Sequence, residues 1–151
     1  MMPNLKSQIE SYDSLVDKLQ AIFVPLLLLF CRLWVAWVFF NSGLVKIASW
    51  DSTLFLFEYE YQVPILPWEI AAYTGTAAEL ILPVFLAIGF FTRPMAAILF
   101  VFNIIAVVSY PLLWEKGFYD HQLWGLMILV VIVWGAGPLS ADGQIRRVMD
   151  K

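Results

Sequence analysis

Three polar residues that can carry charge or form hydrogen bonds interrupt long apolar stretches of this sequence. Arg32 lies in LLLLFCRLWVAWVFFNSGLVKI (26–47), Glu79 in AAELILPVFL and Asn103 in FVFNIIAVV. A charge at the centre of a bilayer costs at least ~2.5 kcal/mol, so such residues usually pair with one another or serve a site. A guanidinium, a carboxylate and an amide can close a buried network, bind a small polar group or pass protons.

The composition defines the environment of these residues. Hydrophobic residues make up 62% of the chain and charged residues 14%, and the mean hydropathy is +0.79. These values are typical of an all-α integral membrane protein. The net charge of −3 is scattered, without the basic block of a nucleic-acid-binding protein. The single cysteine, Cys31, excludes an internal disulfide or a CxxC pair.

Four apolar runs are long enough to cross about 30 Å of hydrocarbon as helices. They cover residues 22–45, 68–91, 94–113 and 118–136. We therefore predict a polytopic four-transmembrane-helix bundle over residues 21–143 and a cytoplasmic tail at 144–151. Apolar residues recur with helical period in residues 1–20, which predicts an amphipathic N-terminal helix on the membrane surface.

The predicted spans place the three polar residues at a similar depth. Arg32, Glu79 and Asn103 fall near the middle of the first, second and third spans. We therefore predict that Glu79 is the partner of Arg32 and that Asn103 completes a buried polar niche. Two interpretations remain open. The niche fixes helix register, or it binds the polar head of a small ligand such as a quinone carbonyl.

Two further residues lie near the opposite ends of the spans, and we predict that they close the outer mouth of a cavity. These are Lys46 and His121. The alternatives are that Lys46 extends its amine to the membrane interface and that His121 is an interfacial polar group. No second His or Cys lies near His121 in the sequence, so we predict no metal site.

Basic residues are distributed unevenly between the two predicted faces of the membrane. The face that holds both termini has six of them and the opposite loops have Lys46 and Lys116. The six are Lys6, Lys18, Arg93, Arg146, Arg147 and Lys151. Since loops rich in Lys and Arg stay in the cytoplasm, we predict that both termini are cytoplasmic.

Several segments together resemble a known family. Arg32 followed by FFNSGLVKI, then AELILPVFLAIGFFTRPMAAIL, then Asn103 and finally GAGPLSAD are similar to the DoxX family of small four-helix bacterial membrane proteins. The resemblance covers about residues 25–143, and the loop at 49–67 is particular to this chain. It implies a multi-pass protein of the bacterial cytoplasmic (inner) membrane. The family is associated with redox complexes, including a thiosulfate:quinone oxidoreductase, with oxidative stress and with catechol resistance.

This resemblance leads to one main functional hypothesis, a membrane subunit of a quinone-linked redox complex. The Arg32, Glu79 and Asn103 niche would bind the quinone. The sequence has no haem ligand pair, flavin fingerprint or thiol pair, so no intrinsic cofactor is predicted. Electrons would come from a soluble or membrane oxidoreductase partner. The alternatives are a small-solute or proton transporter, working as a homo-oligomer, and a non-catalytic membrane anchor.

Overall fold

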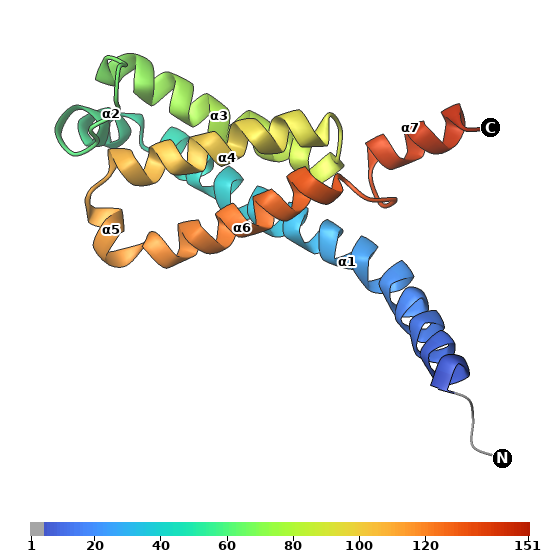
Figure 1. Cartoon of the computed structure of the whole chain (residues 1–151). Coiled ribbons are helices and arrows are strands. Elements are labelled where there is room, and N and C mark those ends of the chain that lie inside the picture. The colour runs from blue at the N-terminus through green and yellow to red at the C-terminus, as the bar shows by residue number, and fades with distance from the viewer. Residues whose placement is uncertain (1–4) are drawn as a thin grey trace.

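The computed structural model describes residues 5–151, apart from the side chain of Glu115, and contains helices and loops but no strand in that range. The seven helices are α1 (Leu5–Ala48), α2 (Trp50–Tyr59), α3 (Trp68–Ile88), α4 (Thr92–Ser109), α5 (Leu112–Lys116), α6 (Phe118–Trp134) and α7 (Ala141–Met149). Helices α1, α3, α4 and α6 form a bundle, with α2 and α5 at one end and α7 at the other (Figure 1). We call these the α2 end and the α7 end.

The bounds of α3, α4 and α6 agree with the predicted spans to within a few residues, whereas α1 begins well before its predicted span. Helices α1, α3 and α4 are long and apolar enough to cross a membrane, which confirms an all-helical structure of the described residues with three candidate membrane spans. Helix α6 is apolar but has 17 residues, fewer than the ~20 that a span usually needs. The fourth span therefore stays a prediction.

Helix α1 is much longer than a single span. Its 44 residues extend over about 66 Å, roughly twice the hydrocarbon thickness. The N-terminal part projects away from the bundle (Figure 1), and most of its side chains are exposed. The helix has no break at residue 20, where we placed a segment boundary; residues 1–4 lie outside the described part. Its position on a membrane surface stays a prediction.

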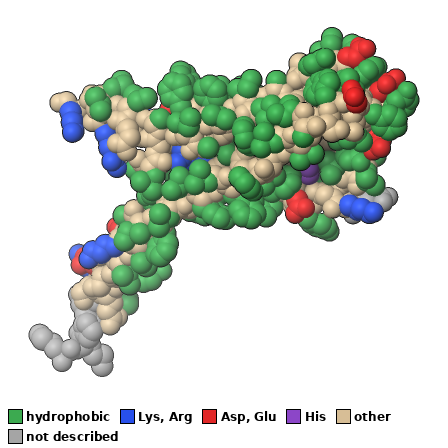
Figure 2. All heavy atoms as spheres, turned by 180° about the vertical axis from the view of Figure 1, so that it is seen from behind, with side chains coloured by type: hydrophobic (Ala, Val, Ile, Leu, Met, Phe, Trp, Pro, Cys, Tyr) green, Lys and Arg blue, Asp and Glu red, His purple; other side chains and the backbone are tan. Residues whose placement is uncertain are grey.

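The bundle core is apolar and closely packed. Its buried residues are Cys31, Val35, Phe39, Leu82, Leu86, Ala96, Leu99, Ile128 and Val131. A methyl group on Gly43 of α1 would lie 2.8 Å from Leu80 Cδ2 and 3.2 Å from Glu79 Cβ of α3, so the two helices approach closely at this small residue. The outer surface is also largely apolar (Figure 2), as contact with lipid requires.

Charged residues gather at the two ends of the bundle. Acidic side chains lie at the α2 end, and Lys and Arg side chains are prominent at the α7 end and on the projecting part of α1 (Figure 2). Helix α2 contributes Asp51 and Glu58, whereas α7 contributes Arg146 and Arg147. The apolar belt between the two ends is the part of the molecule that suits the bilayer core.

Candidate functional site

The prediction that Arg32 pairs with Glu79 was wrong. Arg32 is fully buried at the α7 end, where its Nη2 donates a hydrogen bond to the carbonyl of Leu139. Glu79 instead forms an ion pair with Lys46, with 2.6 Å between Nζ and Oε2. Each residue therefore has its partner at a different end of the bundle.

The antiparallel register of α1 and α3 explains this error. Gly43 of α1 lies against Glu79 of α3, and Arg32 of α1 lies against Gly89 at the end of α3. Going from the first contact to the second means going back eleven residues along α1 and forward ten residues along α3. Eleven helical residues span about 16 Å. We predicted the depth of Arg32 and Glu79 by counting residues from the ends of the apolar runs, which placed both at the same level. Because α1 continues beyond the predicted start of its span, that end was not a valid reference point.

At the α7 end the chain after α6 folds back over the turn between α3 and α4. Asp142 accepts hydrogen bonds from the backbone N–H groups of Phe91 (3.0 Å) and Thr92 (2.9 Å), and its own N–H donates to the carbonyl of Gly89 (2.9 Å). Asp142 thus caps the N-terminus of α4 across the turn. We call Arg32, Gly89, Leu139 and Asp142 the α7-end clamp.

Two opposing effects set the pKa of Asp142. Partial burial alone would raise it, but the hydrogen bonds from Thr92 and Phe91 and the charge of Arg146 outweigh burial and hold the pKa of this carboxyl below its ordinary value. Asp142 therefore stays ionised at neutral pH as an N-terminal cap, where a negative charge also interacts favourably with the helix dipole.

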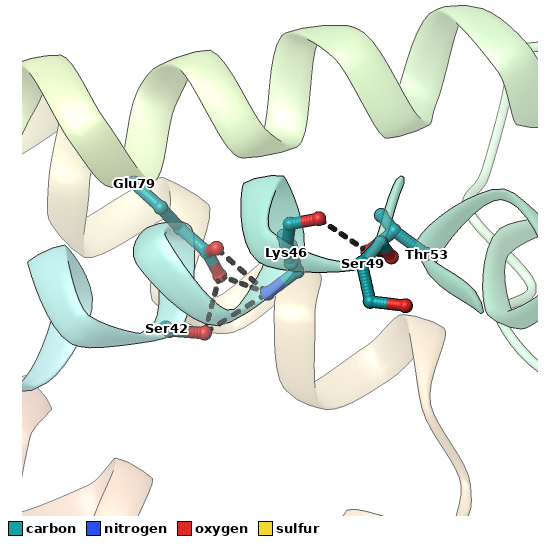
Figure 3. Close-up of polar contacts among 5 residues, drawn as sticks. All are labelled: Ser42, Lys46, Ser49, Thr53 and Glu79. Atoms are coloured by element: carbon teal, nitrogen blue, oxygen red, sulfur yellow. Dashed lines mark hydrogen bonds and ion pairs between the residues drawn. The ribbon is translucent and has the colours of Figure 1, made fainter. Parts of the chain in front are cut away.

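At the α2 end Lys46 and Glu79 form a compact polar group with Ser42 (Figure 3). The Lys46 ammonium lies 2.8 and 2.6 Å from the two carboxylate oxygens and 2.9 Å from Ser42 Oγ. Ser42 in turn donates to Glu79 Oε1 at 3.1 Å. Thr53 donates to the carbonyl of Lys46 at 2.9 Å and so connects α2 to this group (Figure 3). The side chain of Lys46 is 15% exposed and that of Glu79 is 9% exposed.

This polar group lies in the wall of a cavity of about 440 Å³. The cavity is lined by Ser42, Lys46, Phe57, Tyr61, Val63, Leu66, Ala71, Thr74, Gly75, Ala78, Glu79, Phe102, Ile105, Ala106, Ser109, Tyr110, Leu113 and His121. Most of this lining is apolar or aromatic. Ser109 is 4% exposed and its hydroxyl has no hydrogen-bond partner in the described residues. Burial raises the pKa of Tyr61 to about 12, so its phenol stays protonated.

Asn103 is separate from both charged groups and contacts His121 instead. Its Nδ2 donates to the carbonyl of His121 at 3.0 Å, and its Oδ1 lies 2.7 Å from His121 Nδ1. The three residues predicted as one niche therefore occupy three places. Lys46 and His121, predicted at the outer mouth, share the cavity with Glu79. Ligand binding by any of these residues stays a prediction.

Sequence reasoning missed Ser42, Ser109 and Tyr61. A signal existed for Ser42, because Ser42 and Lys46 are four residues apart and therefore neighbours on one face of α1. Ser109 and Tyr61 come from the ends of α4 and α2, where the sequence pattern gives no information on which loops meet. The described residues include no group of three or more His, Cys, Asp or Glu that could hold a metal ion.

The fold defines a helical membrane protein with polar groups buried at two levels. The DoxX family model matches residues 27–111, more than half of the chain, and the chain belongs to this family. An uncharacterized protein of Haemophilus influenzae (strain ATCC 51907 / DSM 11121 / KW20 / Rd) is 30% identical over 142 residues, which cover 87% of this chain and 91% of that protein. No solved structure matches the chain.

Proposed function

We propose that the chain is an integral membrane subunit of a quinone-linked redox complex and that its cavity binds a quinone-class ligand. Such a ligand has an aromatic or dione ring with oxygen substituents and an apolar body. The observation that carries the proposal is an apolar cavity whose wall holds the Lys46–Glu79 ion pair and His121. The residues concerned replace the Arg32, Glu79 and Asn103 niche expected from the sequence.

The size and lining of the cavity fit a ring of this kind. Small-molecule sites usually measure about 300–1,000 Å³ and combine apolar walls with few polar groups. Phe57, Phe102 and Tyr61 supply aromatic surface against which a ring can pack. The unpartnered hydroxyl of Ser109 also favours a bound group, because buried polar atoms normally have a hydrogen-bond partner.

The charge distribution supports an orientation in the membrane. Arg93, Arg146 and Arg147 lie at the α7 end, and cytoplasmic loops are rich in such residues. We therefore infer that the α7 end faces the cytoplasm of a bacterium, that both termini are cytoplasmic and that the cavity lies toward the outer face. A reporter fused after Lys151 should be active in the cytoplasm, and one inserted after Gln62 on the opposite side.

A binding measurement tests the ligand. The purified protein in detergent should bind decylubiquinone in a titration calorimeter, and Lys46→Met and Glu79→Gln, which alter the polar wall of the cavity, should each change the affinity at least about tenfold, the effect of 1.4 kcal/mol. Lys116→Met and Glu69→Gln change exposed residues of the same types and should leave binding unchanged. Equal binding by all four variants would contradict a site beside the ion pair.

A second measurement tests the complex. The full chain, extracted gently from its own membrane, should bring with it an oxidoreductase that carries the flavin, haem or thiol pair that this chain lacks. A symmetric assembly of this chain alone, with solute or proton flux in proteoliposomes, would instead support the transporter hypothesis.

A further inference from the structure

Asn103 fixes the tautomer of His121. The Asn103 amide nitrogen must be the group that donates to the His121 carbonyl, because a carbonyl can only accept. The amide oxygen is then the atom 2.7 Å from His121 Nδ1, and an oxygen of this kind needs a donor. Nδ1 therefore carries the proton. In a neutral imidazole the other nitrogen, Nε2, is then a hydrogen-bond acceptor.

The Nε2 atom of His121 is therefore available to accept a hydrogen bond from a ligand. His121 lines the cavity, and no hydrogen bond joins its Nε2 to another described side chain or backbone group. The ring is held in place from its side by Trp124, with 4.6 Å between the ring centroids. Because Nδ1 already donates to Asn103, the imidazole of His121 can interact with a ligand only through the lone pair of Nε2.

The Lys46–Glu79 ion pair can accept a further hydrogen bond from a ligand but has no proton left to donate to one. An ammonium has three protons, and Lys46 has three acceptors within reach: both carboxylate oxygens of Glu79 and the hydroxyl of Ser42. The carboxylate accepts three hydrogen bonds, one of them from Ser42, and has room for about four. The unused capacity at this wall is therefore mainly that of an acceptor.

We infer that the cavity binds the reduced, hydroxyl-bearing form of its ligand, a hydroquinone or a phenol, in preference to the dione. One ligand hydroxyl donates to His121 Nε2, and Asn103 is the positioning residue that keeps this lone pair available. A hydroquinone hydroxyl can donate to Nε2 and also accept from the hydroxyls of Ser109 or Tyr61, which line the same cavity. The oxygens of a dione only accept, so a dione leaves Nε2 without a donor and loses that hydrogen bond. This inference rests on the proposed function, since it concerns the ligand of the same cavity.

Three related probes separate the two proposals. Trimethylhydroquinone, trimethylbenzoquinone and the dimethyl ether of the hydroquinone are titrated anaerobically into the purified full chain. The hydroquinone should bind roughly tenfold more tightly than either of the others, as the loss of one hydrogen bond beside an acceptor implies. Similar affinities, or tighter binding of the quinone, would overturn the preference and leave the proposed function intact. Absence of binding by all three would contradict the proposed function itself.

Two variants and a spectrum test the role of the histidine. His121→Phe should still bind the quinone but lose the preference for the hydroquinone, and Asn103→Leu should reduce that preference. His121 is the only histidine, so with any purification tag removed its ring nitrogens give one pair of ¹⁵N signals. Wild type should show the proton on Nδ1, and Asn103→Leu a mixture of tautomers. A wild-type proton on Nε2 would overturn the inference, whether or not either variant folds.

Discussion

Both ends of this bundle bury charged residues, but they do so in opposite ways. At the α7-end clamp, Arg32 is fully buried and its Nη2 donates to the carbonyl of Leu139, while its Nε and Nη1 have no hydrogen-bond partner in the described residues. The backbone N–H groups of Phe91 and Thr92 complete the hydrogen bonds of Asp142. At the α2 end, the Lys46–Glu79 pair is bonded within the wall of a cavity. Buried charge holds the chain together at one end and leaves room for a ligand at the other.

The glycines show the same contrast. A methyl group on Gly89 would lie 1.7 Å from Arg32 Nη1 and 2.5 Å from Ser140 Cβ, whereas one on Gly75 in the cavity wall would find its nearest atom, on Phe57, at 3.4 Å. The first position leaves no space for a side chain, and the second does. If the comparison is right, a side chain added at Gly89 should lower stability, whereas one added at Gly75 should reduce binding and leave the fold intact. The buried charges at either end should matter for stability.

The largest effect should come from separating the charges at the α2 end. Lys46→Met or Glu79→Gln leaves a charge without its partner and should lower the free energy of unfolding by up to about 3–5 kcal/mol, less where the remaining group changes its protonation. The double variant should recover part of this loss, with a coupling energy of about 0.5–3 kcal/mol. Denaturant unfolding in detergent measures all three variants.

The double variant of Lys46 and Glu79 needs a control pair that does not interact. Arg32 and Glu79, the pair predicted from the sequence, serve as this control. Arg32→Gln and Glu79→Gln share no partner, and the helical rise between Arg32 and Gly43, the neighbour of Glu79, is about 16 Å. Their effects should therefore add to within about 0.3–0.5 kcal/mol. Strong coupling between Arg32 and Glu79 would contradict the separation of the two ends.

The next effect should come from Gly89→Ala in the clamp. Gly89 has a φ of +73°, in the left-handed region where a side chain costs ~1–2 kcal/mol, and the methyl would also displace the buried Arg32 guanidinium. Overpacking adds ~1–3 kcal/mol, so a loss of roughly 2–5 kcal/mol is expected in the same unfolding measurement. Gly117→Ala is the control, because its methyl would meet only the flexible end of Leu113. Equal losses in both would mean that the clamp is not tightly packed.

The sequence was sufficient for most of the bundle helices. Hydropathy predicted α3, α4 and α6 to within a few residues, because crossing a membrane forces about 20 apolar residues into one helix. It did not predict where α1 begins, nor the short helices α5 and α7. The same logic identified Arg32, Glu79 and Asn103 as residues that need polar partners. All three have such partners, but not one another.

What the sequence did not contain was the register between helices. The register of α1 against α3 depends on Gly43 packing against Leu80 and on how far α1 extends beyond the bilayer core, and neither leaves a periodic signal. The clamp depends on Leu139 and Asp142 meeting residues about fifty or more positions earlier. Contacts of this kind follow from tertiary packing, which a single sequence does not reveal.

A smaller effect is expected from Asp142→Asn. The amide keeps one of the two acceptor oxygens but loses the other and the negative charge at the N-terminus of α4, which should together cost about 0.5–2 kcal/mol at neutral pH. The pKa of Asp142 is lower in the folded chain than in the unfolded one, so its contribution is present above the unfolded value of about 3.9 and is lost as the pH falls through the folded value. Thermal unfolding of wild type and Asp142→Asn should therefore differ at pH 7 and converge as the pH falls below the folded pKa of Asp142. A constant difference would show that the carboxylate charge is not what stabilises the turn.

The smallest effect on stability, and the sharpest on binding, should come from Gly75. A methyl there makes only ordinary contacts with Phe57 and Phe102, and alanine favours a helix over glycine by up to about 1 kcal/mol, so Gly75→Ala should be as stable as wild type or slightly more stable. Gly75→Leu extends further into the cavity and should abolish ligand binding while the chain still folds, because the space it enters is open to a ligand. Together with Gly89→Ala, this variant separates the two ends: one glycine is required for the fold, and the other leaves space for a ligand. If Gly75→Leu binds the ligand as wild type does, the site lies elsewhere; if it fails to fold, the cavity is part of the packed core and the contrast between the two ends is lost.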